Sequence, residues 1–381
     1  MTSEAPAGRG LENVVVASTR LSAIDGFAGR LSYAGYDIHD LAERASYEEV
    51  LYLLWYGDLP NKHDLEAFSA RLLAERSLSA AEHALVRGIP EGGHGMDALR
   101  TLVSGLGQLD PHADDLAPEQ VERTGLRIAA KMPTLIAAWD RARRGLPPLE
   151  PDAHLGHAAN FLSMLHGQAP SPAAARAFDT YLVLLAEHGL NASTFAARVA
   201  IGAGADVYCA IVAAIGTLKG LLHGGANQKA METFLEIAEP EQAQDYIEAM
   251  LARHERLMGV GHRIYKVEDP RVRHLRRQVQ ILAEGSEGRW QAIADEVGRV
   301  VGEHPHFARR QLNPNVEFYS APLLYTLGLP LDLFTAAFAI SRVAGWMAHI
   351  REQLADNRLI RPKADYAGPA ARGFVAIGER S

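Results

Sequence analysis

The stretch Gly220–Asn227 contains a histidine, His223, that is followed directly by two glycines. Helical periodicity begins near Ala226 and runs toward Ile237, which predicts that His223 lies just before a helix N-terminus. The partial positive charge at such an end disfavours the imidazolium form. A neutral histidine can donate a hydrogen bond to a carbonyl oxygen that gains negative charge, as in triosephosphate isomerase. The same pattern also fits a loop histidine with no chemical role.

A second histidine, His262, lies in the stretch Gly259–Arg271. Asp269 suits the N-cap of a helix and Pro270 suits its first position, so a helix is predicted to begin here. Arg271 then falls in the first helical turn, where a cation is unfavourable to the helix itself. The position becomes favourable if Arg271 and the helix end together bind an anion such as a carboxylate. The alternative is a solvated surface arginine.

Two further charged residues stand among apolar neighbours. Glu317 follows Val316 and precedes Phe318, and partial burial there would raise its pKa and make it a better proton acceptor near neutral pH. At a loop edge it would instead lie in solvent. Arg342 has no acidic residue three or four positions away, so no local salt bridge is available. Because a buried unpaired charge is costly, Arg342 either reaches solvent or is met by an anion.

The elements that must position these residues are predominantly helical. Apolar residues recur three or four positions apart in Ser46–Tyr56, Ala80–Gly88, Ala173–Leu185, Gln242–Met258 and Leu331–Leu354. Near the start, Val14–Thr19 and Arg30–Tyr33 flank the pair Asp25-Gly26, which favours hairpin turns. The sequence therefore predicts an almost all-α protein with one short N-terminal β-hairpin.

Composition limits the class of protein. The chain of 381 residues has 38 Lys and Arg against 46 Asp and Glu, and no basic run favours nucleic acid or an anionic membrane. The single cysteine, Cys209, excludes a disulfide framework and is expected to be a small buried hydrophobe. Met1–Gly10 lacks the apolar core of a signal peptide, and Arg342 interrupts the most apolar stretch, Thr335–Ile350. We expect a cytoplasmic protein that does not enter a membrane.

Together, these motifs resemble those of the citrate synthase family, and they stand in the family's order. The resemblance rests on His223-Gly-Gly-Ala-Asn227, Gly259-Val-Gly-His262, Asp269-Pro-Arg271, Asn315-Val-Glu317-Phe-Tyr319, Ser341-Arg342 and Arg361-Pro362. It extends from Gly10 to Gly368 and includes Gly10–Val15 and Gly29–Asp37. The family fold is almost entirely helical. It implies a large domain from residues 1–222 and 323–381, an inserted small domain at 223–322, and a homodimer that completes each active site.

The resemblance also implies a chemical role for three residues. His223 would donate a hydrogen bond to the thioester carbonyl of acetyl-CoA while Glu317 removes a proton from the acyl methyl group. His262 would protonate the 2-oxo carbonyl of oxaloacetate as carbon attacks it, and the citryl thioester would then be hydrolysed to citrate and CoA. These residue types suit the reaction, because an enol that forms beside a thioester needs a base and a hydrogen-bond donor at once.

The remaining candidates would bind the substrates. His188, Arg271 and Arg342 match residues that contact oxaloacetate, and Arg361 matches an arginine that the partner subunit contributes. Lys266 falls where a basic residue meets a phosphate of coenzyme A. The resemblance implies no metal and no cofactor, since the coenzyme A thioester is a substrate.

Position 317 departs from the usual pattern, because most of the family has Asp there. The extra methylene of Glu moves the carboxylate by about an ångström, a displacement that can cost on the order of a hundredfold in rate. A catalytically silent paralogue is therefore one alternative reading. A 2-methylcitrate synthase that uses propionyl-CoA is a second, since one methylene in an apolar pocket is worth only about 1–3 kcal/mol. A zinc site made of His188, His223, His262 and Glu317 is a third, although nearby arginines would repel a cation.

Overall fold

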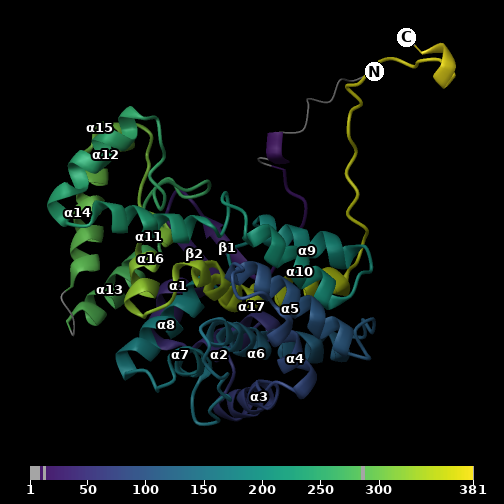
Figure 1. The fold of residues 1–381 in the computed structure, drawn as a ribbon, viewed down its shortest axis with the longest axis horizontal. Coiled ribbons are helices and arrows are strands. Elements are labelled where there is room, and N and C mark those ends of the chain that lie inside the picture. The colour runs from purple at the N-terminus through teal and green to yellow at the C-terminus, as the bar shows by residue number, and fades with distance from the viewer. Residues whose placement is uncertain (1–8, 12–13, 285–287, 381) are drawn as a thin grey trace.

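The computed structural model describes residues 9–11, 14–284 and 288–380. Helices make up most of the body and a small sheet lies near the N-terminus (Figure 1), which confirms the predicted fold class. The elements in chain order are β1 (Ser22–Asp25), β2 (Arg30–Tyr33), β3 (Tyr36–Asp37), α1 (Ile38–Arg44), α2 (Tyr47–Tyr56), α3 (Lys62–Ala74), α4 (Ala80–Gly88), α5 (Gly95–Leu109), α6 (Pro118–Arg143), α7 (His157–His166), α8 (Pro172–Leu185), α9 (Ala192–Gly202), α10 (Val207–Leu218), α11 (Ala226–Ile237), α12 (Ala243–Ala252), α13 (Val272–Ala283), α14 (Arg289–Glu303), α15 (Pro305–Arg309), α16 (Val316–Thr326) and α17 (Phe334–Ala355).

The hairpin forms around Asp25-Gly26, but its first strand is not the predicted one. β1 pairs with β2 in antiparallel register, with Ser22 opposite Tyr33 and Asp25 opposite Arg30. The Asp25 carboxylate accepts the backbone N–H groups of Phe27 and Ala28, so the turn closes directly after it and the strand must end there. Val14–Thr19 therefore forms no strand, and β3 adds a third strand that was not predicted. In the motif Gly10–Val15, residues 12 and 13 lie outside the described part of the chain.

Local signals predicted several helices well and one of them poorly. α2 begins at a capping box, in which Ser46 and Glu49 each satisfy a backbone N–H of the other's residue. The segment predicted as Gln242–Met258 is shorter, because α12 ends at Ala252. His254 adopts a left-handed conformation with φ of 58°, which a helix cannot continue through.

The last long helix, α17, runs through the centre of the molecule (Figure 1). Leu331–Ala355 is the one helical stretch in the described part of the chain that is long and apolar enough to cross a membrane, and it lies buried within the protein. Trp346 and Met347 on this helix have no exposed surface. The same burial applies to Arg342, which is 1% exposed, so the first of the two alternatives for this arginine, escape to solvent, does not occur.

The chain beyond α17 leaves the body as an extended arm (Figure 1). Side chains along the arm stay exposed, among them Leu359 at 60% and Phe374 at 89%. Helices α11 to α16 gather at the other side of the molecule, with α13 packed against both α16 and α8. The division into domains at residues 223 and 322 stays a prediction.

Candidate active site

His223 lies in the turn directly before α11, three residues ahead of Ala226, as predicted. Its Nε2 atom is 2.8 Å from Oγ of Ser193, at the start of α9. Burial, followed by the charge of Arg342, lowers the pKa of His223 to about 4. The imidazole is therefore neutral at pH 7. Ser193 was not predicted, because nothing in the local sequence marks it as the partner of a histidine thirty residues away.

His262 is held in one tautomer by its own loop. Its Nδ1 atom accepts the backbone N–H groups of Ile264 at 3.0 Å and Tyr265 at 3.1 Å. An Nδ1 that accepts two hydrogen bonds carries no proton, so the ring proton of the neutral form is on Nε2. Burial, with Arg271 as the next cause, lowers the pKa of His262 to about 4. The loop thus presents a neutral histidine with one N–H to donate.

The Glu317 segment is fastened to the His262 loop. The backbone N–H of Asn315 donates to the carbonyl of Gly259, and its side-chain amide donates to the carbonyl of Gly261 at 2.8 Å. Asn315 also caps α16 by accepting the N–H of Glu317. The carboxyl of Glu317 is in the first turn of α16, and burial raises its pKa. The predicted base is therefore tied to the same backbone that holds His262.

His188 is the residue around which the other candidates gather. Its Nε2 is 3.1 Å from the hydroxyl of Tyr265, and its ring centroid is 5.5 Å from that of His262. Burial lowers its pKa well below the usual value. Electrostatic neighbours contribute in the same direction, and these are Arg271, His262, Arg342 and His223. Two arginines and two other histidines thus surround His188 in one place. Tyr265 was missed, although it stands three residues after His262.

Arg271 is buried at 2% exposure, so the surface alternative is wrong. Its guanidinium donates twice to the carboxylate of Asp269, at 2.9 and 2.6 Å. The helix begins two residues later than predicted, at Val272, after a turn in which the Asp269 carboxylate accepts the backbone N–H of Arg271 at 3.0 Å. Burial acts to lower the pKa of the guanidinium, but the charge and hydrogen bonds of Asp269 outweigh it and hold that pKa above its usual value. Its remaining guanidinium N–H groups meet no carboxylate among the described residues and can receive a second anion.

Arg342 is equally buried but has no ion-pair partner within the described chain. Its Nε atom donates to the carbonyl of Leu185 at 2.6 Å, and its guanidinium carbon lies 4.8 Å from the ring centroid of Phe338. Burial lowers its pKa to about 10, which leaves it charged at pH 7. Because a buried charge without a partner is costly, the geometry favours the second alternative, in which an anion binds to Arg342.

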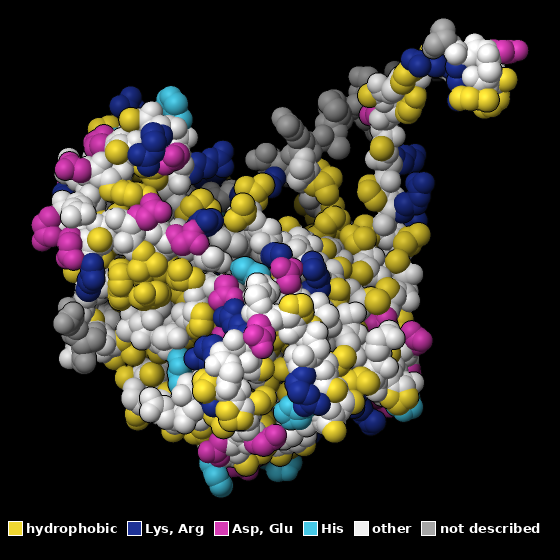
Figure 2. Space-filling model, viewed as in Figure 1, with side chains coloured by type: hydrophobic (Ala, Val, Ile, Leu, Met, Phe, Trp, Pro, Cys, Tyr) yellow, Lys and Arg dark blue, Asp and Glu magenta, His cyan; other side chains and the backbone are white. Residues whose placement is uncertain are grey.

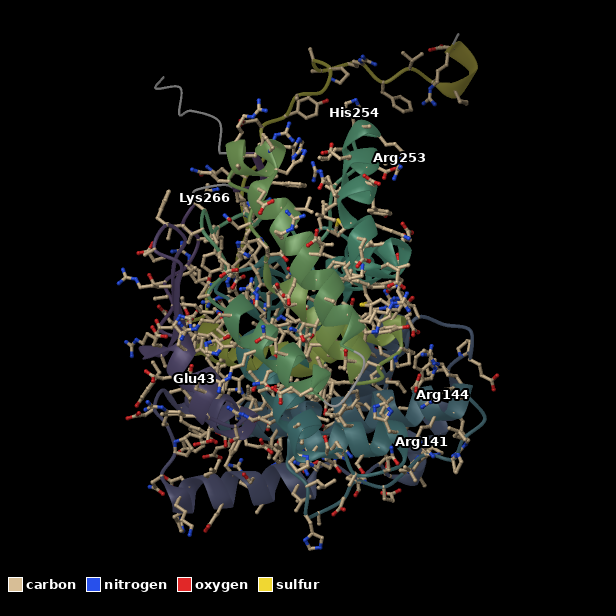
Figure 3. All side chains as sticks on the ribbon, turned by 90° about the vertical axis from the view of Figure 1, so that its left-hand side faces the viewer. Glu43, Arg141, Arg144, Arg253, His254 and Lys266 are labelled. Atoms are coloured by element: carbon tan, nitrogen blue, oxygen red, sulfur yellow. The ribbon has the colours of Figure 1, made fainter. Side chains whose placement is uncertain are left out.

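Two predicted residues stay away from this cluster. Arg361 lies on the exposed C-terminal arm, and among the described residues no hydrogen bond or ion pair joins it to another candidate. Lys266 is exposed at the edge of the molecule (Figure 3), where its backbone N–H donates to the carbonyl of Gly26 in the β1–β2 turn. Within the single chain, the structure thus brings together six of the eight candidate residues.

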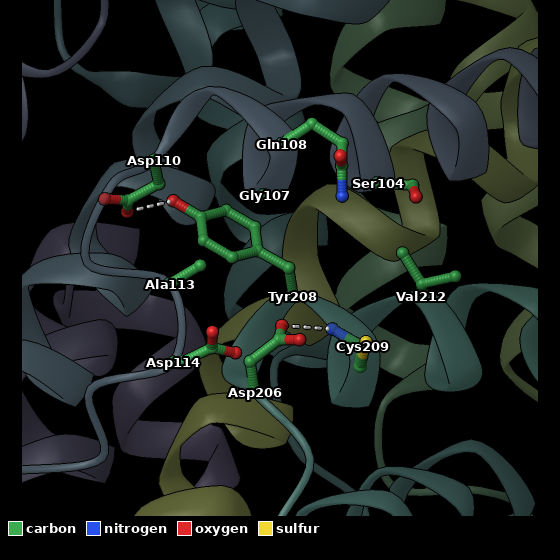
Figure 4. A pocket seen from close by; sticks show the side chains of 10 residues that line it. All are labelled: Ser104, Gly107, Gln108, Asp110, Ala113, Asp114, Asp206, Tyr208, Cys209 and Val212. Atoms are coloured by element: carbon green, nitrogen blue, oxygen red, sulfur yellow. Dashed lines mark hydrogen bonds between the residues drawn. The ribbon is translucent and has the colours of Figure 1, made fainter.

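Cys209 is exposed, so the prediction of a buried cysteine is wrong. It lies on the open side of α10, in a pocket that α5 also lines (Figure 4). A hydrogen bond with Asp206 and partial burial raise the pKa of its thiol to about 11, so the thiol is protonated and unreactive at pH 7. This pocket is separate from the histidine cluster.

In the described part of the chain, no group of three His, Cys, Asp or Glu side chains is arranged to hold a metal ion.

Comparison with known proteins gives one result. The family model described as "Citrate synthase, C-terminal domain" matches residues 10–363. The chain belongs to the citrate synthase family. A Bacillus subtilis relative called "Citrate synthase 2" is 47% identical over 98% of this chain and 100% of its own length. Two Mycobacterium tuberculosis relatives called "2-methylcitrate synthase" are 41% identical over 96% of this chain and 91% of theirs.

Solved structures of the family share the whole fold. Citrate synthase from Pyrobaculum aerophilum superposes with a TM-score of 0.91 at 40% identity, over 99% of this chain and 97% of that one. A Thermoplasma acidophilum citrate synthase, solved as a ternary complex with carboxymethyl coenzyme A and oxaloacetate, has a TM-score of 0.92 at 31% identity, over 98% and 99%. The predicted family and fold class are confirmed.

Proposed function

We propose that this protein condenses acetyl-CoA with oxaloacetate and hydrolyses the resulting thioester to citrate and CoA. The observation that carries the proposal is the surroundings of His188, where two neutral histidines and two buried arginines meet. Neutral histidines suit hydrogen-bond donation to carbonyl oxygens, and arginines suit carboxylates. The binding of oxaloacetate and a coenzyme A analogue by the Thermoplasma relative supports this assignment of substrates.

In the proposed mechanism, Glu317 removes a proton from the acyl methyl group, and a histidine stabilises the enol that forms. His223 is suited to that role when the proton of its neutral ring is on Nδ1, a form in which the Ser193 hydroxyl turns from Oδ1 of Asn191 and donates to Nε2 instead. The enol carbon then attacks the 2-oxo carbon of oxaloacetate, and His262 gives its Nε2 proton to the new alkoxide. The raised pKa of Glu317 makes it a stronger base than an exposed carboxylate once it is ionised.

Oxaloacetate is proposed to lie between His188, Arg271 and Arg342. Arg342 supplies guanidinium N–H groups that meet no carboxylate in the described chain, and Arg271 supplies those left over from its pair with Asp269. Orientation of the 2-oxo acid by two arginines holds its carbonyl carbon toward the acyl group, and such positioning accounts for several kcal/mol in a two-substrate reaction.

We further propose a homodimer in which the C-terminal arm reaches the partner's site. The arm projects from the body with apolar and basic side chains along it (Figure 2). Exposure of these apolar side chains to water is unfavourable and would be relieved by packing against a second chain. The open sides of α9 and α10 carry small or apolar residues such as Val199 and Cys209, which a second copy would cover. Arg361 would then add a third arginine to the partner's dicarboxylate site.

A mixing experiment tests this sharing. A Glu317→Gln chain and an Arg361→Ala chain should each be nearly inactive as homodimers. In a mixed dimer, the site with Glu317 receives Arg361 from the other chain, so one of its two sites is intact. Co-refolding equal amounts should therefore restore about a quarter of native activity, since about half of the dimers are mixed and each has one working site. Absence of any recovery would contradict a shared site.

The choice of acyl group is tested separately. Thiol release from acetyl-CoA and from propionyl-CoA, each with oxaloacetate, should show a higher kcat/KM for acetyl-CoA. A preference for propionyl-CoA would favour 2-methylcitrate synthase instead. We also propose that the enzyme is cytoplasmic, needs neither metal nor cofactor, and contacts coenzyme A phosphate through Lys266. Full activity in excess chelator and a raised KM for acetyl-CoA in Lys266→Ala are the expected results.

A further inference from the structure

The segment Leu185–Glu187 runs along one face of α17, beside the proposed dicarboxylate site. The carbonyl of Leu185 accepts Nε of Arg342, and the carbonyl of Ala186 accepts the backbone N–H of Gly345 at 3.1 Å. One turn further on, Oε1 of Glu187 lies 3.1 Å from Nε2 of His349. Arg342, Gly345 and His349 therefore form one stripe of α17, and three consecutive residues of the other segment follow it.

This contact brings the backbone of α17 close to the segment 185–187. The N–H of Gly345 donates to the carbonyl of Ala186, and one turn back the carbonyl of Ser341 accepts the hydroxyl of Tyr47. A side chain at position 345 would force its surroundings to shift, since a Cβ atom there would lie 2.3 Å from Oε2 of Glu187. The Glu187 carboxylate is thus pressed against the helix backbone, one turn from Arg342.

Glu187 is itself completely buried, and its charge is maintained by a chain of hydrogen bonds. Nδ1 of His349 lies 3.0 Å from Nη1 of Arg198, which can only donate, so the proton of the neutral His349 ring is on Nε2 and points to Glu187. The hydroxyl of Ser22 donates to the same oxygen at 3.0 Å. The second oxygen, Oε2, has no hydrogen-bond partner among the residues that the structure describes. These bonds favour the ionised form despite the burial.

The two buried arginines of the site therefore each have one buried carboxylate. Arg271 is bonded directly to Asp269, whereas the carboxylate of Glu187 lies against Gly345, one turn of α17 from Arg342, and forms no ion pair with that arginine. Of the carboxylates near Arg342, Glu187 contributes most to its electrostatic environment. Before substrate arrives, the two arginines carry two positive charges and the two carboxylates carry two negative charges, so the net charge of the four residues is zero.

We propose that Glu187 is a fixed counter-charge that weakens dicarboxylate binding at Arg342, and that Arg198 and His349 are positioning residues that keep it in place. The inference rests on the proposed function, because it assumes that Arg342 receives a carboxylate of oxaloacetate. A dianion placed on Arg342 is attracted by the guanidinium and repelled by Glu187 through a largely apolar interior. Repulsion of this kind lowers affinity and hastens release.

Removal of the charge alone should therefore tighten binding. In Glu187→Gln, the dissociation constant of oxaloacetate, measured by calorimetry on the intact protein without coenzyme A, should fall by about tenfold or more. Glu187→Asp keeps the charge and should stay within about threefold of the native value. Glu352→Gln is the matched control, since Glu352 bonds to Arg198 at 2.8 Å in the same network but lies further along α17. It should leave the affinity unchanged.

A second variant serves if Glu187→Gln does not fold. Burial acts to raise the pKa of Glu187, and His349 is the largest of the contributions that lower it. His349→Phe removes that contribution. The groups that face Glu187 would then be Arg342 and Glu352 on α17, Arg198 on α9 and Tyr33 on β2. With burial dominant, the carboxyl pKa should rise and Glu187 should bind a proton as pH falls. Oxaloacetate should then bind more tightly at pH 6 than at pH 8, by a larger factor than in the native protein.

The outcomes separate the two proposals. Native protein that does not bind oxaloacetate at all would contradict the proposed function and, with it, the inference. Native protein that binds oxaloacetate while Glu187→Gln binds equally or more weakly would overturn the inference alone. If the role of Glu187 were purely structural, Glu187→Gln would bind oxaloacetate more weakly and would also melt at a lower temperature. Tighter binding by Glu187→Gln, with Glu352→Gln unchanged, would support the counter-charge.

Discussion

Replacement of Glu317 by Gln separates the catalytic role of this residue from its contribution to folding. The two side chains have the same shape, and no side chain in the described part of the structure donates a hydrogen bond to the Glu317 carboxylate. Gln therefore breaks no side-chain contact. Since burial raises the pKa of Glu317, its ionised form is less stable in the folded chain than in the unfolded chain at pH 7. The variant should melt at the same temperature as the native protein or higher.

The rate should change in the opposite direction. An amide cannot accept the methyl proton, and loss of a general base typically costs about 10²–10⁴ in rate. We expect kcat to fall by at least about a hundredfold, which corresponds to roughly 2.7 kcal/mol of transition-state stabilisation. Oxaloacetate affinity should be nearly unchanged, because the arginines remain. Thiol release with acetyl-CoA and oxaloacetate, calorimetry and thermal melting measure the three quantities on the same sample. A fall in kcat smaller than about tenfold would refute the assignment of the base.

Three further predictions follow from the same geometry. His262→Ala should lower kcat by at least about a hundredfold in the thiol-release assay, because the alkoxide loses its proton donor. The native kcat/KM should decline as pH falls through the raised pKa of Glu317, because the base becomes protonated. His223 and His262, with pKa values of about 4, stay neutral above pH 5. A decline at low pH that is unchanged in Glu317→Asp and shifts in a histidine variant would contradict this assignment. Gly345→Ala should destabilise the protein by about 1–3 kcal/mol or more in urea unfolding, because its Cβ would lie 2.5 Å from the carbonyl of Ala186.

Features that depend on a few neighbouring residues were predictable from the sequence. The capping box at Ser46 and the helix after His223 follow from local propensity and apolar spacing, and the structure has both. The hairpin shows the limit of this reasoning, because Asp25 marks the turn while the partner strand depends on where the chain can pair. The left-handed His254 that ends α12 has no local signal either.

Features that depend on distant segments were not predictable. The burial of Arg342 could be stated only as one of two alternatives, since its surroundings come from Leu185 and Glu187 on another element. The partners that fix the ring of His223 and the charge of Glu187 lie on α9 and α17, far away in sequence. Cys209 appeared to be a core residue because its neighbours are apolar, although a second copy of the chain would also explain that composition.

Release of free thiol from acetyl-CoA tests whether the chain condenses an acyl-CoA with a 2-oxo acid. We expect release that depends on oxaloacetate and that yields one citrate for each thiol. Thiol release without oxaloacetate would indicate a simple thioesterase. No release from acetyl-CoA or propionyl-CoA at high enzyme concentration would contradict the account and favour a catalytically silent member of the family.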